Sequence, residues 1–209
     1  MPNNEVEDVM QNPYILVQNI LTSVDDGNTI MNGKTISDEN FISIELYGSS
    51  VHKKKENDNN SSFHLENESG VGDITLYQVL PGIELVYNDM HMEYCNKKQV
   101  TASEVMEINY CKEGRSECLF GENQYCYMAS GDLSFCSLHG NKHQSQFPTS
   151  HYHGVTVVID FSRITDEMKN VLKLLSVNLE RIKEVACMQE FTVIRANQTI
   201  EHIFSELYT

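Results

Sequence analysis

The stretch FPTSHYHGVTVVID, residues 147–160, decides the fold of this chain. A turn-forming phrase, Phe147 to Gly154, leads into the β-branched run from Val155 to Asp160, which is typical of a buried strand. Short alternating segments precede it from residue 104 onward, and we expect them to be strands separated by turns at Gly114, Gly121 and Gly131. Closely spaced strands of this kind predict an antiparallel barrel or sandwich rather than alternating βαβ units.

The sequence on either side of this region divides the chain into three parts. Residues 71–162 are predicted to form an antiparallel β-barrel. Residues 163–209 show helical spacing and are predicted to form two or three helices, the first capped by Thr165. Residues 1–70 form an N-terminal segment whose polar stretch, 49–70, is rich in Lys, Glu, Asn and Ser and is predicted to be a loop. The expected fold class is mainly β with C-terminal α.

Composition excludes several functions. The 209 residues carry 15 basic and 30 acidic side chains, a formal charge of −15, so the chain by itself is a poor partner for nucleic acid. No stretch approaches the ~20 apolar residues that span a bilayer, and we expect no membrane contact. The N-terminus does not resemble a signal peptide, and the six cysteines include no Cys-x-x-Cys pair. We therefore expect reduced thiols and a cytoplasmic location.

Several ordered phrases of the sequence resemble one family. They are MEINYCKEGRSE at 106–117, Gly131-Asp132-Leu133, the phrase from Phe147 to Asp160, and Ile194 to Tyr208. Together, over residues 72–208, they resemble the N-terminal domain of AraC-family transcriptional regulators. The resemblance implies that residues 71–162 form a cupin-like β-barrel that binds a small-molecule effector, and that the helices mediate homodimerisation. We expect no cofactor. The resemblance also implies a C-terminal helix-turn-helix domain. No such sequence precedes Thr209, so we expect DNA contacts only through that absent domain.

The barrel interior is the expected effector site, because small barrels of this kind hold one small ligand. The sequence does not fix which alternate residues of each strand face inward. The candidate contacts with the effector are Met106, Tyr110, Glu117, Tyr127, Phe135 and His153.

His151 and His153 are the outside candidates for a metal site, because residues i and i+2 of a strand point to one face. Metal-binding cupins usually carry a His-x-His pair and a Glu on the strands before the Gly-Asp turn. The matching stretch here, from Asn109 to Glu117, contains no His, so we expect no metal and no enzyme activity. The alternative is a stand-alone metal-dependent cupin enzyme that uses His151 and His153. A redox sensor built on Cys111 and Cys118 is a weaker alternative.

The C-terminal helices supply the candidate dimer interface. Its residues share helical spacing and serve core and interface alike: Val171, Leu172, Leu175, Ile200, Ile203, Phe204 and Leu207. A natural truncated regulator that forms inactive heterodimers is a further option.

Overall fold

The computed structural model describes residue 47 and residues 51–56, 60–96, 104–120, 124–138, 144–174, 177–188 and 191–207. The predictions for residues 1–46, for the turn at Gly121 and for Leu175 lie outside these ranges.

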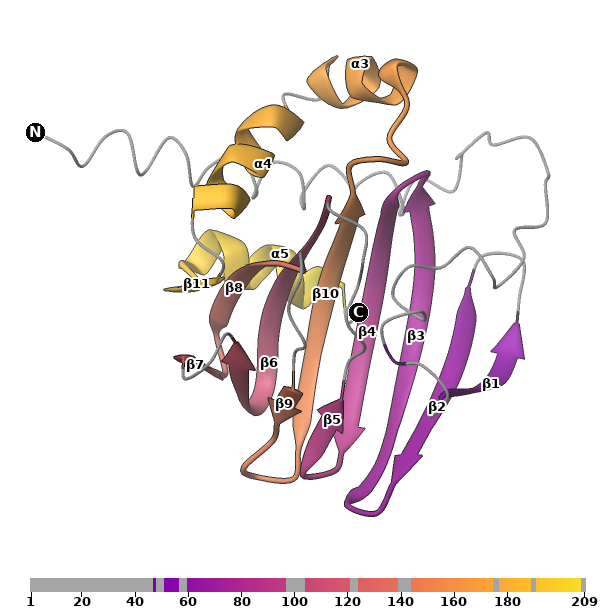
Figure 1. Ribbon diagram of the computed structural model, residues 1–209, viewed down its shortest axis with the longest axis vertical. Helices are drawn as coiled ribbons and strands as arrows, with labels where there is room; N and C mark the ends of the chain where they lie inside the picture. The colour runs from indigo at the N-terminus through magenta and orange to yellow at the C-terminus, as the bar shows by residue number, and fades with distance from the viewer. Residues whose placement is uncertain are drawn as a thin grey trace, which may run out of the picture.

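Two antiparallel sheets joined through one long strand make up the body of the molecule (Figure 1). The larger sheet, called sheet A, has the order β1-β2-β3-β4-β10-β6-β8-β11. Its strands are β1 (Val51–Glu56), β2 (Ser61–Asn67), β3 (Gly70–Leu80), β4 (Ile83–His91), β10 (Tyr152–Asp160), β6 (Val105–Phe120), β8 (Asp132–Ser137) and β11 (Phe191–Arg195). The smaller sheet, called sheet B, contains β5 (Tyr94–Asn96), β9 (Gln144–Gln146), the second half of β6, and β7 (Gln124–Ala129).

Strand β6 belongs to both sheets. Its first half pairs with β10 and β8, and its second half pairs with β7 and β9. Gly114, predicted to be a turn between strands, instead lies within β6 at a φ of +84°, beside an irregularity in the β10 register. A residue without a Cβ lets the strand bend there and continue, so β6 leaves one sheet and enters the other.

The stretch 49–70, predicted to be a polar loop, contains β1 and β2. In β2 the side chains of Ser61, Phe63 and Leu65 are buried, and the residues between them are half-buried. This alternation of period two is the pattern of a strand. The loop prediction was wrong here because it relied on the polar composition of the stretch instead of this alternation.

Three helices follow β10: α3 (Asp166–Leu174), α4 (Leu179–Met188) and α5 (Gln198–Glu206). The hydroxyl of Thr165 accepts from the amide of Met168, as a cap on α3 does, and the side chain of Asn197 accepts from the amide of Ile200 on α5. The predicted fold class, mainly β with C-terminal α, is confirmed.

The core is divided by sheet A into two apolar clusters. One fills the space between the two sheets and includes Phe63, Val86, Met128 and Tyr152. The other lies on the opposite face of sheet A, where the helices cover strands β4, β10, β6 and β8. Each of these strands therefore presents one set of alternate residues to the interior and the other set to the helices.

The residues predicted to form the dimer interface fall into two groups, those packed in the helix-covered cluster and those exposed at the surface. Leu172, Ile200, Ile203 and Phe204 are buried within the chain, and Leu207 packs against the same cluster. The first four are core residues of one protomer, whereas Leu207 is only partly buried. Val171, which is 47% exposed, is the only described member of the predicted set with a substantially exposed side chain; its neighbour Leu174 is 86% exposed.

Candidate functional site

A cavity of about 50 Å³ lies between the two sheets. Its apolar wall comes from both sheets and from the segments that close them: Tyr47, Met90, Met128, Phe147, Tyr152 and Phe191. Its polar wall comes mainly from sheet A: Asn88, Glu107, Asn109, Ser134 and Thr156. A mostly apolar space with a few converging polar groups is the usual composition of a small-molecule site.

Four hydrogen bonds connect the polar wall into one chain. The hydroxyl of Tyr47 donates to Oδ1 of Asn88 (3.2 Å), and Nδ2 of Asn88 donates to Oγ1 of Thr156 (3.0 Å). Thr156 donates in turn to Oδ1 of Asn109 (2.7 Å), and Nδ2 of Asn109 donates to Oγ of Ser134 (3.3 Å). All four bonds run in the same direction, which lets each polarise the next. The chain crosses four strands and orients Asn88 and Asn109, the two side-chain amides in the described lining of the cavity.

Three of the predicted effector contacts lie on the face of sheet A opposite the cavity. Met106, Tyr110 and Phe135 belong to the cluster covered by the helices, and the ring of Tyr110 stacks on Phe204 of α5 at 4.4 Å. Burial raises the pKa of Tyr110. The cavity is lined by the alternate residues of the same strands. For these strands, the sequence analysis chose the more apolar of the two alternating sets of residues as effector contacts. That set packs on the helices.

The other three predicted contacts lie outside the cavity as well. Glu117 pairs with Arg115 at 3.1 Å and lines a separate open depression with Tyr94, Gln144 and Gln146. Tyr127 is exposed beneath the guanidinium of Arg115. His153 is half-buried on the outer face of sheet A; burial lowers its pKa, and the nearby Asp89 partly opposes that effect.

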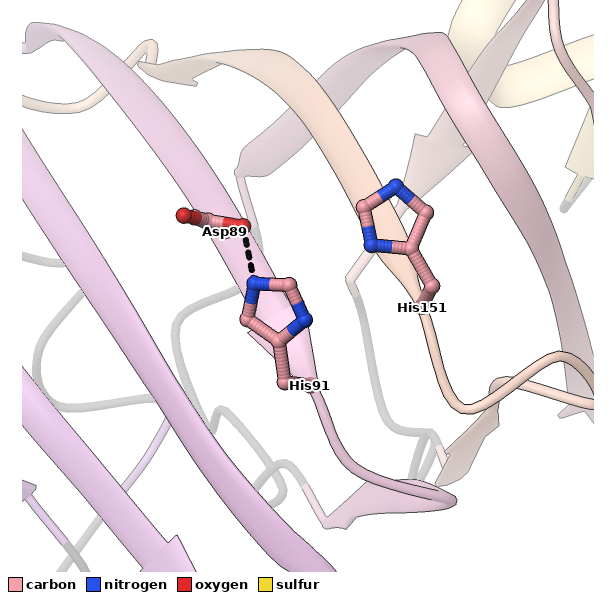
Figure 2. A group of neighbouring side chains, drawn as sticks. All are labelled: Asp89, His91 and His151. Atoms are coloured by element: carbon pink, nitrogen blue, oxygen red, sulfur yellow. Dashed lines mark ion pairs between the residues drawn. The ribbon is translucent and has the colours of Figure 1, made fainter.

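The two histidines predicted as outside candidates for a metal site, His151 and His153, do not lie in the same group of side chains. His151 lies just before β10 and meets Asp89 and His91, the last residues of β4, while His153 is not a member of this group (Figure 2). The ligand atoms of Asp89, His91 and His151 lie within 4.8 Å of one another. Within the described lining of the cavity, by contrast, there is no histidine.

The thiols do not form the predicted pair. Cys111 and Cys118 lie on the same strand, and Cys118 is opposite Cys126 on β7. Burial raises the pKa of the Cys111 thiol and of the Cys126 thiol to about 12, so both are protonated near neutral pH.

Sequence reasoning missed Asn88, Thr156, Asp89 and His91. A signal for the first two was present: an amide or hydroxyl inside an otherwise apolar strand, as in VTVV at 155–158, indicates a polar group with a buried partner. The cluster of Asp89 with His91 and His151 depends on the pairing of β4 with β10, which joins residues about 60 positions apart.

Comparison with known proteins gives fold-level likeness only. No family model matches the chain, and no curated protein matches it. Among solved structures, the Clostridium difficile EutQ protein is 18% identical, over 49% of this chain and 72% of its own, with a TM-score of 0.38. A cupin 2 conserved barrel domain protein from Salinispora arenicola is 15% identical, over 67% of this chain and 99% of its own, with a TM-score of 0.37.

The iron(II) form of HppE is a third similar structure, 10% identical over 50% of this chain and 59% of its own, with a TM-score of 0.40. At these scores the likeness supports no functional conclusion for this chain. In the part of the chain that the structure describes, no helix has the length and hydropathy needed to cross a membrane.

Proposed function

We propose that this chain is the effector-sensing domain of an AraC-type transcriptional regulator, and that it binds a small molecule in the cavity between the sheets rather than transforming it. The regulatory part of this proposal rests on the resemblance of residues 106–117, 131–133 and 147–160 to that family. The binding part rests on the structure, where the described lining offers oriented amides and hydroxyls and no imidazole.

The observation that carries the proposal is that the cavity and the helices share a wall. Asn109 belongs to the polar chain on the cavity side of β6, and the next residue, Tyr110, stacks on Phe204 on the helix side. A ligand that changes the position of Asn109 therefore acts on the strand that supports α5. A ligand with different affinity for two arrangements shifts their populations, which is the requirement for sensing.

The size of the cavity limits the ligand. About 50 Å³ accommodates roughly three to five water molecules, at about 10–15 Å³ each, or a ligand of a few non-hydrogen atoms. A larger effector enters only if a lining side chain moves. Tyr47 is one candidate, because its hydroxyl contacts the first amide of the polar chain and its movement would uncover that amide.

The test is a thermal-shift screen against metabolites and drugs in the presence of a chelator, since a ligand that binds only the folded state raises the midpoint of unfolding. We expect a concentration-dependent rise that is lost in Thr156→Val, which removes the hydroxyl between Asn88 and Asn109 without changing the side-chain shape. The matched control is Thr75→Val on the outer face of β3, which should keep the full response.

Hydrogen exchange in α5 provides the second readout. The active ligand should change the exchange of the amides of residues 198–206 in the wild type and not in Thr156→Val. A hit that stabilises both variants equally would place binding outside the cavity. A hit that binds in the cavity but leaves α5 exchange unchanged would refute sensing while leaving binding intact.

A further inference from the structure

The outer face of sheet A carries a row of ionisable residues beyond the part covered by the helices. Cross-strand partners connect six of them without a break, from β1 through β2, β3, β4 and β10 to β6: His52, His64, Asp73, Asp89, His153 and Glu113. His91 and His151 lie beside this row. The row therefore combines three imidazoles with three carboxylates, which are ligand types of transition metals.

We propose that Asp89, His91 and His151 bind one divalent transition-metal ion on the outer face of the barrel. Asp89 and His91 are residues i and i+2 of β4 and point to the same side, and His151 faces them from the residue just before β10 (Figure 2). Their neighbours on β4, Asn88 and Met90, face the cavity, so the metal site and the cavity lie on opposite faces of the sheet.

The distances suit a chelating site. Nε2 of His91 lies 3.1 Å from Oδ1 of Asp89, and the rings of His91 and His151 have centroids 5.3 Å apart. Two donor atoms that are each about 2.1 Å from one zinc ion lie about 3 to 3.5 Å apart, so the first pair needs little movement. The ligand atom of His151 lies within 4.8 Å of the other two, so the His151 side chain has to move closer to them when the ion binds.

The backbone at both histidines is held in place by a neighbouring glycine. A Cβ on Gly70 would collide with the carbonyl oxygen of His91, and a Cβ on Gly114 would collide with that of His151. The hydroxyl of Thr149 also donates to the His151 carbonyl (3.0 Å). Both ligand-bearing segments are therefore packed closely against the next strand, which fixes where the imidazoles can reach.

A second carboxylate orients one of the imidazoles. Nε2 of His151 lies 3.4 Å from Oε2 of Glu113, which leaves Nδ1 of His151 for the metal. Metal-binding histidines commonly present their other ring nitrogen to a carboxylate in this way, which raises their basicity. The three ligands are accessible to an ion from solvent, because the side chains of Asp89, His91 and His151 are 51%, 58% and 35% exposed.

Two imidazoles and one carboxylate select the class of metal. This donor set suits Zn²⁺, Ni²⁺, Co²⁺ or Cu²⁺, with open positions for water or an exogenous ligand, and does not suit Mg²⁺ or Ca²⁺, which prefer oxygen donors.

Calorimetric titration of the untagged protein with ZnCl₂, in a buffer without chelator or phosphate, tests the site. We expect saturable binding of one ion per chain, weakened at least tenfold in His91→Ala and in His151→Ala. His202→Ala on α5 is the matched control and should bind as the wild type does. His153→Ala should change the affinity less than threefold, which distinguishes this site from one built on His151 and His153.

Cobalt provides a check on geometry. Co²⁺ added to the wild type should give a visible absorption band that is absent in His91→Ala, with circular dichroism confirming that each variant is folded. The proposal is overturned if zinc binding is undiminished in both His91→Ala and His151→Ala. It is also overturned if the wild type shows no saturable binding below about 100 µM zinc.

Discussion

At the scale of single residues, Gly114 controls how β6 meets the segment that carries His151. Its φ of +84° and its contact with the His151 backbone require a residue without a Cβ. We expect Gly114→Ala to lower the free energy of unfolding by at least about 3 kcal/mol. The left-handed conformation costs an alanine about 1–2 kcal/mol, and displacement of a backbone carbonyl adds to it.

Gly131→Ala is the matched control for this prediction. Gly131 has nearly the same φ, +83°, but the nearest contacts of an added Cβ would be with the end of the exposed Arg195 side chain, which can move aside. Urea denaturation of both variants should show a loss at Gly131 limited to about 1–2 kcal/mol. Equal losses at the two glycines would show that contact with the His151 backbone contributes nothing.

At the scale of the elements, the sequence predicted the helices and strands in which apolar residues recur with a regular spacing. The helices around Met168 and Ile203 were found from apolar spacing, and VTVV at 155–158 from its β-branched residues. The strand β2 was missed because Phe63 and Leu65 are its only large apolar residues among polar neighbours. Gly114 was interpreted as a turn because a glycine that bends a strand and one that ends it have the same local sequence.

Helix α5 should depend on one aromatic contact. Phe204 is 1% exposed and its ring stacks on Tyr110 of β6. Truncation to Phe204→Ala removes the stack and leaves a cavity, so we expect a loss of about 3–5 kcal/mol in the free energy of unfolding. His202→Ala on the exposed side of the same helix should stay within about 0.5 kcal/mol. Chemical denaturation measures both, and a small loss at Phe204 would mean that α5 does not pack on the sheet as described.

At the scale of the whole molecule, the candidate site could not be assigned from the sequence because both faces of the central strands are covered. One face packs on the helices and the other lines the cavity. Residues 106, 108 and 110 of β6 pack on the helices, while 107 and 109 face the cavity. Both sets are largely buried, so hydrophobicity alone does not say which is inside the barrel. The hydrogen-bonded polar chain through Asn109 and Thr156 shows which set faces the cavity, and that chain forms only when four strands are paired.

Homodimerisation stays a prediction, and among the described residues of the predicted interface the one clearly exposed side chain, Val171, belongs to α3. Leu174 is 86% exposed and Val171 is 47% exposed, three residues apart on one face of the helix, whereas the rest of the described stripe is core. A second copy of the chain that covers this face would bury both side chains. Sedimentation velocity of the wild type should then show a dimer, and Leu174→Glu should shift it toward monomer by at least tenfold in dissociation constant.

Lys173→Glu separates loss of apolar contact from the effect of added negative charge, because Lys173 is an exposed neighbour on the same helix. This variant changes the charge by two units, against one for Leu174→Glu, yet it keeps the apolar pair. A dimer held by Val171 and Leu174 should therefore be weakened less by Lys173→Glu than by Leu174→Glu. The effect of Lys173→Glu should decrease further at high salt, where charge repulsion is screened. A wild type that is monomeric at 100 µM, or a dimer indifferent to Leu174→Glu, would rule out α3 as the interface.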